Sequence, residues 1–358
     1  MSQNWLKYEP YELNSLEKEE LIIDGLNTLT NYHSKNCESY ARILKVQNLE
    51  NKKFQNLCDF PFLPVRLFKN KILKSISDDD VVKTMISSGT TGQQVSKIFL
   101  DRETALLQTK VLTKIISSYI GRKRLPLLIL DSESTIKNRD LFSARGAGIL
   151  GFSMFGSKRI FAFDDDMHLN ESFIFDFLIE NQGKPILLFG FTYIVYSFFL
   201  KSLERSNKKI DLSNCILIHG GGWKKLISEA ISNDEFKRRF KSICGLTKIF
   251  DYYGMVEQTG SIFMECEFGY LHAPVYADVL IRRPNDFTIA QKGEIGIVQV
   301  LSLLPKSYPG HSLLTEDQGI IYGEDDCNCG RLGKYFKIIG RIKSAEIRGC
   351  SDTFEGRN

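Results

Sequence analysis

The feature that most restricts the fold of this chain is a rhythm of short apolar runs, each followed by a longer amphipathic stretch. The apolar runs have the length of buried strands, and the stretches between them repeat with helical spacing. The successive pairs are KTMISS with 102–120, LPLLIL with 139–152, RIFAF with 171–182, PILLFG with 193–205, and NCILIHGG with 223–242. Alternating strands and helices predict an α/β fold, built from mostly parallel sheets with flanking helices.

The segments on either side of this rhythm have a different texture. Residues 10–56 alternate charged and apolar positions at helical spacing, and DFPFLPVRLFKNKIL then brings two prolines and an extended apolar run, which predicts a strand. After residue 246 the chain is strand-rich and punctuated by glycine. We therefore predict four parts: a helical N-terminal section with a first strand (1–80), an α/β nucleotide-binding core (81–245), a smaller β-rich subdomain (246–340) and a short C-terminal tail (341–358).

Composition excludes several classes of protein. No run of about 18 apolar residues exists, and the polar, acidic N-terminus is unlike a secretory signal, so we expect a cytoplasmic protein without a membrane segment. The net charge is only +4, and the basic runs GRKR and FKRRFK are short and lack interleaved aromatic residues. Nucleic acid is therefore not an expected partner. Eight cysteines in a reducing compartment are free, catalytic or metal-bound.

A loop of small residues lies in the stretch MISSGTTGQQVSK, residues 85–97. It stands between a strand-like and a helix-like segment and offers backbone N–H groups, hydroxyls and the ammonium of Lys97. These groups can cradle an anion such as a phosphate. The loop is not a Walker A motif, because Gln94 stands where that motif needs glycine. A solvated turn can have the same composition, so the loop alone does not establish a phosphate-binding site.

Three later motifs follow the loop in a specific order: DYYGMVEQTG (251–260), TEDQG (315–319) and GRIKSAEIRG (340–349). In order and separation, the four motifs resemble the core motifs of adenylate-forming enzymes. Together with FPFLPVRLFK and IHGGGWKK, they make residues 55–358 most similar to the acyl-protein synthetases of bacterial bioluminescence operons, with phenylacetate-CoA ligases as cousins. The implied fold is the N-terminal domain of an adenylate-forming enzyme.

The resemblance implies that a carboxylate attacks the α-phosphorus of ATP, giving acyl-AMP and pyrophosphate. The β- and γ-phosphates would be held by Ser87, Ser88, Gly89, Thr90, Thr91, Gly92 and Lys97. Glu257 would serve Mg²⁺, a hard cation that takes carboxylate oxygen. The adenosine would be held by Gly220, Gly221, Gly222, Tyr253, Gly254, Asp317 and Arg341. His219 is expected to be structural. Phe189, Gly190 and Phe191 either line an acyl pocket or belong to the core.

The C-terminal tail departs from the usual pattern of adenylate-forming enzymes. Only residues 342–358 follow Arg341, so the mobile C-terminal domain is expected to be absent or vestigial. The lysine of that domain would be replaced by Lys343, by Arg348 or by another base. Cys350 follows the flexible Gly349, and nearby bases would favour its thiolate. In the enzymes this chain resembles, a cysteine near the C-terminus carries the acyl group, and Cys350 is the predicted carrier.

Four further side chains suggest a structural zinc site in the β-rich segment. ECEFGYLH supplies Cys266 and His272, and CNCGR supplies Cys327 and Cys329. Three thiolates and one imidazole can close a tetrahedral zinc site. The C-x-C spacing is tighter than the usual C-x₂-C, and unliganded strand cysteines are the alternative.

The sequence thus predicts an ATP- and Mg²⁺-dependent acyl-protein synthetase, a ligase that transfers a fatty or related acyl group to its own cysteine. The acyl group would then pass to an acceptor protein such as an acyl reductase or a carrier protein. One alternative is a ligase of the phenylacetate-CoA ligase type that delivers to CoA or to a carrier-protein thiol. Another is a non-catalytic nucleotide-binding scaffold, against which the intact Glu257, Asp317 and Arg341 argue.

Overall fold

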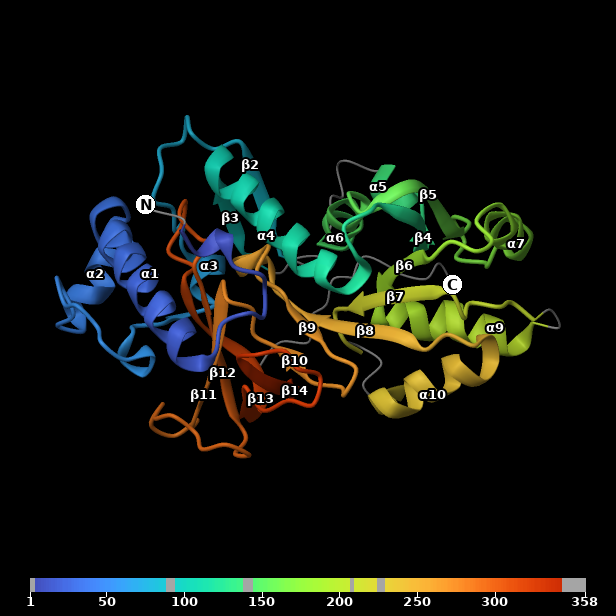
Figure 1. The fold of residues 1–358 in the computed structure, drawn as a ribbon. Coiled ribbons are helices and arrows are strands. Elements are labelled where there is room, and N and C mark those ends of the chain that lie inside the picture. Colours follow the sequence, from blue (N-terminus) through green and yellow to red (C-terminus); the bar gives the residue numbers. More distant parts are fainter. Residues whose placement is uncertain (1–3, 88–93, 138–143, 207–208, 224–228, 343–358) are drawn as a thin grey trace. The chain divides into compact units, whose positions relative to one another are not determined.

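A computed structural model describes residues 4–87, 94–137, 144–206, 209–223 and 229–342 of the chain (Figure 1). These residues belong to two compact units. The first contains the described residues of 4–87, 94–118 and 254–342. The second contains the described residues between Tyr119 and Tyr253.

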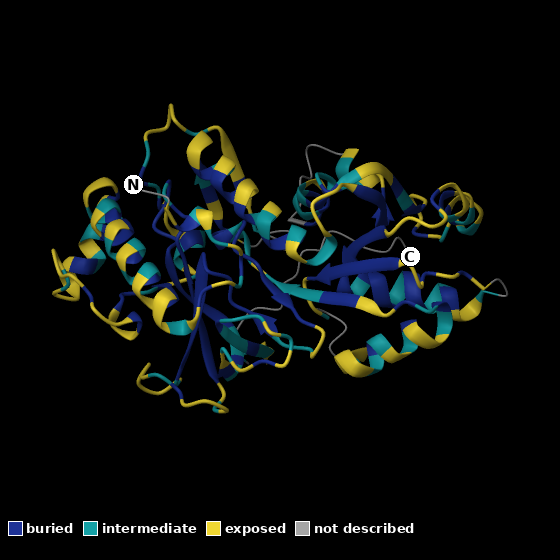
Figure 2. Ribbon diagram, viewed as in Figure 1, coloured by how far each residue is buried: buried dark blue, intermediate teal, exposed yellow. Residues whose placement is uncertain are grey.

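The second unit contains a parallel sheet with the strand order β8-β7-β6-β4-β5. All residues of β4, β6 and β7 are buried, as expected for a parallel sheet covered on both faces (Figure 2). The strands are β4 (Leu125–Ser132), β5 (Gly156–Phe163), β6 (Ile186–Phe191), β7 (Cys215–Gly220) and β8 (Lys248–Tyr253). The helices are α5 (Ser134–Lys137), α6 (Ala144–Ser153), α7 (Glu171–Glu180), α8 (Thr192–Ile194), α9 (Lys201–Arg205) and α10 (Asn233–Cys244). The predicted α/β fold is confirmed.

Two predicted helices of this unit differ from the expectation. The stretch 193–205 contains a π-helix, η4 (Val195–Leu200), between α8 and α9. In the stretch 223–242, α10 begins only at Asn233, because the Ser232 side chain caps it by accepting the backbone N–H of Glu235 at 3.2 Å. The helix ends at Cys244 and is followed by Gly245, whose φ of 71° is the left-handed conformation that glycine adopts readily.

The first unit contains an antiparallel sheet with the strand order β11-β12-β13-β14-β10-β9. Its strands are β9 (Phe263–Glu265), β10 (Leu271–His272), β11 (Ala277–Arg282), β12 (Gly296–Ser302), β13 (Ser312–Glu324) and β14 (Lys334–Arg341). The predicted strand-rich texture of the C-terminal third is therefore present. The N-terminal elements are η1 (Asn4–Lys7), α1 (Ser15–Asn36), α2 (Glu38–Val46), η2 (Leu57–Asp59) and α3 (Leu67–Asn70), and a turn, η6 (Val256–Gln258), precedes the sheet.

Two strand predictions in this unit were wrong in detail. The run KTMISS does not open the parallel sheet: β2 (Lys83–Ile86) pairs antiparallel with β3 (Lys97–Leu100) in a separate two-stranded sheet, followed by α4 (Arg102–Ile120). The run DFPFLPVRLFKNKIL forms only the two-residue strand β1 (Leu63–Pro64), parallel to β13, before α3 begins. A proline cannot donate to a sheet, which limits the length of β1.

Buried charges tie α1 to the antiparallel sheet. Lys18 donates to the carbonyl of Ala273 at 2.9 Å and lies 3.4 Å from the carboxylate of Asp278, which Lys334 also reaches at 2.8 Å. Burial acts to raise the pKa of Asp278, but the two lysines outweigh it and the pKa is lowered. The carboxylate is therefore charged and paired, which a buried ion requires.

Candidate functional site

The ends of the predicted phosphate loop are joined by two hydrogen bonds. The backbone N–H of Ser87 donates to the carbonyl of Ser96 at 3.0 Å, and the N–H of Ser96 donates to the Ser87 hydroxyl at 2.8 Å. The hairpin β2–β3 continues this base with the pair Ile86 and Lys97. Lys97 is exposed and has no ion-pair partner among the described residues. The predicted loop residues Ser88, Gly89, Thr90, Thr91 and Gly92 lie outside the described residues.

Glu257, the predicted magnesium ligand, is a buried carboxylate on η6, with only 6% of its surface exposed. Burial raises its pKa, the nearby Ser96 side chain opposes this effect, and the charges of Glu316 and Asp317 raise the pKa further. Within the part of the chain that the structure describes, no base pairs with it. A buried carboxylate in this position favours a proton or a cation, so the residue fits a site for Mg²⁺.

The backbone around Glu257 is fixed by buried hydrogen bonds. The Tyr308 hydroxyl donates to the Glu257 carbonyl at 2.9 Å. The amide of Gln258 donates to the carbonyls of Gly310 at 2.8 Å and Val300 at 3.2 Å. A Cβ added at Gly310 would lie 2.3 Å from the Tyr308 ring, so glycine is needed for this close approach. These contacts hold the turn that carries the carboxylate.

Asp317 and Arg341, the predicted ribose contacts, face each other across β13 and β14. The guanidinium Nε of Arg341 lies 3.5 Å from the carboxylate of Asp317. Its Nη2 donates to the neighbouring Glu316 at 2.7 Å, and Arg66 also pairs with Glu316. The structure thus brings together the two predicted residues and adds two that the sequence reasoning did not identify.

The predicted adenine contacts of the second unit lie at the carboxyl ends of two parallel strands. Gly220 is the last residue of β7, and Tyr253 is the last residue of β8. A Cβ at Gly220 would lie 2.5 Å from the ring of Tyr252, so the backbone and the ring approach closely because the residue is glycine. Gly221 and Gly222 follow with φ of 85° and 67°. The carboxyl edge is where open α/β sheets bind ligands. Gly254 directly follows Tyr253 and is exposed.

His219 and the aromatic residues of β6 have neighbours in the core of the second unit. Nδ1 of His219 lies 2.9 Å from the Thr192 hydroxyl, and burial lowers the pKa of the imidazole to about 3, so the ring is neutral. Phe189 is fully buried and stacks on Phe152, with ring centroids 3.9 Å apart. Phe191, also buried, lies edge-on to Phe189 at 5.8 Å. These contacts are those of core residues.

The four predicted zinc ligands come together in the first unit. The ligand atoms of Cys266, His272, Cys327 and Cys329 all lie within 4.8 Å of one another. Sγ of Cys266 and Sγ of Cys327 are 4.0 Å apart, and Sγ of Cys329 is 3.3 Å from Nε2 of His272. Tetrahedral zinc needs ligand atoms about 3.3–3.8 Å apart, from bond lengths of about 2.0–2.3 Å. Burial lowers the pKa of His272 to about 4, which leaves the neutral imidazole that a metal binds.

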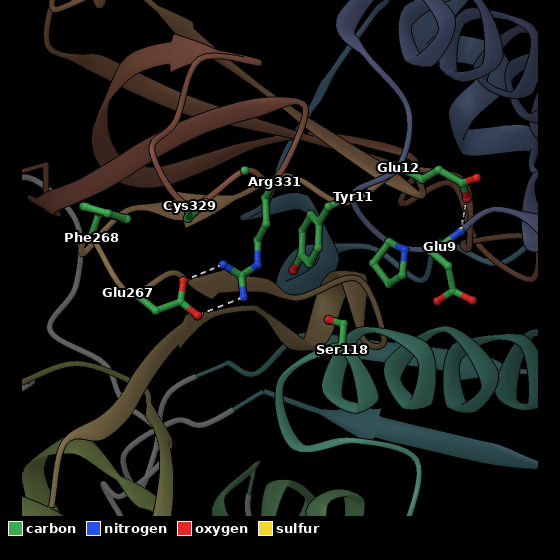
Figure 3. Close-up of a pocket in the computed structure, with 10 residues that line it drawn as sticks. Glu9, Tyr11, Glu12, Ser118, Glu267, Phe268, Cys329 and Arg331 are labelled. Atoms are coloured by element: carbon green, nitrogen blue, oxygen red, sulfur yellow. Dashed lines mark hydrogen bonds and ion pairs between the residues drawn. The ribbon is translucent and has the colours of Figure 1, made fainter.

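A pocket of about 570 Å³ borders this cluster (Figure 3). Cys329 lines it and is only partly buried, whereas Cys266 and Cys327 are buried. Arg331 forms two hydrogen bonds with Glu267, at 2.6 and 3.2 Å, and lies over the ring of Tyr11 at 5.8 Å. The cluster is therefore reached from the surface on the Cys329 side.

A sequence model of the family described as acyl-protein synthetase, LuxE, matches residues 2–357. The chain belongs to this family. Two similar proteins are long-chain-fatty-acid–luciferin-component ligases. The one from Vibrio harveyi is 23% identical over 98% of this chain and 92% of its own length, and the one from Aliivibrio fischeri is 22% identical over 96% and 90%. As a member of the LuxE family, the protein is a ligase.

Solved structures of adenylate-forming ligases share the fold of this LuxE family member. An open conformation of 2-hydroxyisobutyryl-CoA ligase, solved with 2-HIB-AMP and CoA, superimposes with a TM-score of 0.74 at 13% identity and covers 94% of this chain and 72% of the ligase. The same ligase in the thioesterification state gives 0.70 at 15% identity, with 93% and 70% covered. Among the described residues, no helix has the length and apolar character needed to span a membrane.

Four residues that the sequence reasoning missed contact the predicted site residues or lie close to them. Each lies far along the chain from the residue that it approaches, and neither its own type nor its neighbours in the sequence point to that contact. They are Arg66, Ser96, Tyr308 and Glu316. Arg66 lies in FPFLPVRLFK, a stretch already similar to the family, which was the one available signal.

Proposed function

We propose that this ligase uses ATP to convert a carboxylic acid, most simply a long-chain fatty acid, to acyl-AMP and then to an enzyme thioester. The observation that carries the proposal is Glu257: a buried carboxylate without a paired base among the described residues, close to Ser96 at the base of the phosphate loop. The family match over residues 2–357 and the ligase relatives support it.

In the first step, a carboxylate oxygen of the acid attacks the α-phosphorus of ATP, and pyrophosphate leaves. The loop from Ser87 to Lys97 would bind the β- and γ-phosphates, with Lys97 adding positive charge. Mg²⁺, bound by Glu257, would supply charge neutralisation at the phosphates. Such a site lowers the barrier mainly by alignment and electrostatics, since the protein forms no covalent bond in this step.

The adenosine would be recognised by two predicted sets of residues, one for the ribose and one for the adenine. Asp317 would accept hydrogen bonds from the ribose hydroxyls, and Arg341 would donate to the ribose. Gly220, Gly221 and Gly222, with Tyr253 and Gly254, would contact the adenine. The position of Gly220 and Tyr253 at the carboxyl ends of β7 and β8 supports this assignment.

In the second step, the thiolate of Cys350 would attack the acyl carbonyl carbon, forming a thioester while AMP leaves. Cys350, like Lys343 and Arg348, lies outside the described residues. The last described residue, Ile342, is eight positions away, so an extended tail would reach at most about 28 Å from it. The acyl group would then pass to an acceptor protein, such as an acyl reductase or a carrier protein.

Cys350→Ala tests the carrier assignment. Carboxylate-dependent exchange of pyrophosphate with ATP should stay within about 2-fold of the wild type, because that step ends before thioester formation. Hydroxylamine-sensitive acyl label on the denatured chain should disappear. Cys58→Ala is the matched control, because Cys58 is an exposed free cysteine of the first unit, and it should keep the label. Label that persists in Cys350→Ala would assign the carrier role elsewhere, and label on CoA alone would favour the CoA ligase alternative.

Glu257→Ala and Asp317→Ala test the adenylation step. Each should lower pyrophosphate exchange at least about 10-fold, the loss expected from one electrostatic or positioning contact worth about 1.4 kcal/mol or more. Glu294→Ala is the control, because Glu294 is another carboxylate of the same unit and pairs with Arg283. Wild-type exchange in both site variants would exclude these roles, and no exchange in the wild type with any acid would favour the scaffold alternative.

We also propose that Cys266, His272, Cys327 and Cys329 bind a structural Zn²⁺. The separations of their ligand atoms and the neutral imidazole of His272 support this proposal. Four protein ligands leave no open position for substrate, so the metal would stabilise the fold rather than take part in the reaction.

A further inference from the structure

Glu316 is a buried carboxylate that receives two arginines from distant parts of the chain. Its side chain is 7% exposed. Arg341, at the end of β14, donates to it at 2.7 Å, and Arg66, which follows β1, pairs with its other oxygen. Burial strengthens such charge-assisted hydrogen bonds, and a planar guanidinium is held in direction as well as in position.

The backbone around Glu316 fixes both arginines. β1 pairs in parallel with β13 through Leu63 with Leu313, and the N–H of Val65 donates to the carbonyl of Leu314 at 2.9 Å. On the other side, the N–H of Ile342 donates to the carbonyl of Glu316 itself at 3.0 Å. The sheet therefore fixes the backbone position from which each arginine side chain extends.

Arg341 lies between two carboxylates. Its Nη2 is 2.7 Å from Glu316, whereas its Nε is 3.5 Å from Asp317. The shorter contact is with Glu316, so Glu316 directs the guanidinium. Without the Glu316 charge, Asp317 would be the nearest carboxylate to Arg341 among the described residues, and the two would form a closer pair.

We propose that Glu316 is a positioning residue for nucleotide recognition: it holds the Arg341 guanidinium in the direction from which, next to Asp317, it reaches the ribose hydroxyls, and Arg66 balances the buried charge of Glu316. The inference rests on the proposed ATP-binding role of Asp317 and Arg341 and deepens it. A network of ion pairs within the first unit joins two cations, Arg66 and Arg341, to two anions, Glu316 and Asp317. We call these four residues the ribose clamp.

Glu316→Gln tests the clamp, because it keeps the size of the side chain and removes its charge. We expect the Kd for ATP, measured by calorimetry with Mg²⁺, to rise about 10-fold. Glu294→Gln is the matched control, because Glu294 also forms two hydrogen bonds with one arginine, Arg283, at 2.8 and 2.7 Å. The control should change the Kd by less than 2-fold. Thermal melting of each variant reports any loss of folding.

A nucleotide without ribose hydroxyls separates positioning from a merely structural role. The wild type should bind 2′,3′-dideoxy-ATP more weakly than ATP, and Glu316→Gln should bind the dideoxy nucleotide within about 2-fold of the wild type. This comparison is a double-mutant cycle between residue and ligand. An equal loss for both nucleotides would overturn the proposal, because general damage to the fold does not depend on the ribose hydroxyls.

Arg66→Met is the second variant if Glu316→Gln does not fold. The Arg66 side chain is 48% exposed, and its loss leaves the Glu316–Arg341 pair in place. We expect a smaller loss of about 3-fold in ATP affinity, again confined to the nucleotide with hydroxyls. If Arg66→Met binds both nucleotides as the wild type does, Arg66 is not part of the clamp and the proposal as stated fails. A wild type that binds no ATP would instead refute the proposed function itself.

Discussion

Replacing Tyr308 by phenylalanine removes one hydroxyl from the contacts that hold Glu257. The ring of Tyr308 is fully buried and packs edge-on against Phe68 at 6.0 Å, and Gly310 approaches it closely. Because phenylalanine keeps this ring, the packing stays nearly intact. The change therefore isolates the 2.9 Å hydrogen bond to the Glu257 carbonyl.

The cost of this change follows from burial. A typical hydrogen bond contributes about 1 kcal/mol net, and a buried carbonyl left without its donor costs about 1–3 kcal/mol. We expect Tyr308→Phe to lower the free energy of unfolding by about 1–3 kcal/mol, measured by urea denaturation. The freed turn should also place the carboxylate less precisely, so pyrophosphate exchange at limiting Mg²⁺ should fall about 10-fold and recover partly at saturating Mg²⁺.

Tyr276→Phe is the matched control. Its hydroxyl is also part of a fully buried tyrosine and donates to a backbone carbonyl, that of Tyr8, at 2.8 Å. We expect a similar loss of stability without a change in the Mg²⁺ dependence of exchange. If the two variants lose stability equally and neither alters that dependence, the Tyr308 hydrogen bond does not position Glu257, and the reasoning from backbone to carboxylate is refuted.

Three further outcomes are expected. Because burial raises the folded-state pKa of Glu257, its charged form destabilises the metal-free fold, so Glu257→Gln should raise the melting temperature near pH 7 while exchange falls at least about 10-fold. The gain should shrink as the pH falls from the raised folded-state pKa toward the ordinary value of 4.5 and be lost below it, where the folded and unfolded states are both protonated; a lower melting temperature of the variant at pH 7 would contradict this. Purified protein should contain one zinc per chain by elemental analysis, and Cys327→Ser should lose it together with several degrees of melting temperature; wild type without zinc would exclude the site. Gly220→Val should lower ATP affinity at least about 10-fold, because its Cβ would collide with the ring of Tyr252 at 2.5 Å. The control is Gly183→Val, a glycine of positive φ away from the carboxyl ends of the strands, whose Cβ would meet no atom within 4 Å. Equal ATP affinity in both variants would remove Gly220 from the site.

The sequence was sufficient to predict the parallel sheet, because each of its buried strands appears in the sequence as a short apolar run. It was also sufficient to predict that Cys266 and His272 would meet Cys327 and Cys329, since both pairs lie in one strand-rich segment. It was not sufficient for KTMISS, where the same local pattern describes a strand of an isolated hairpin as well as a strand of the main sheet. Local patterns fix the type of an element better than its partners.

The site residues that the sequence did not identify have long-range causes. Arg66 and Glu316 are 250 positions apart, and nothing near either residue marks it as paired. Ser96 is one more small polar residue after a loop rich in them, and its position near Glu257 depends on tertiary structure. Only the register of β1 on β13 and the burial of η6 single these residues out.

The pairing of β1 with β13 also determines when the protein can finish folding. On a growing chain, Leu63 and Pro64 emerge long before their partners Leu313 and Leu314, whereas the strands β4 to β8 lie within one continuous segment, 125–253. The second unit can therefore acquire its core during synthesis, while α1 and β1 keep apolar surface exposed until the last strands are made. Such late, non-local closure is slow and favours aggregation. We expect nascent chains of this ligase to depend on chaperones mainly through their first 87 residues.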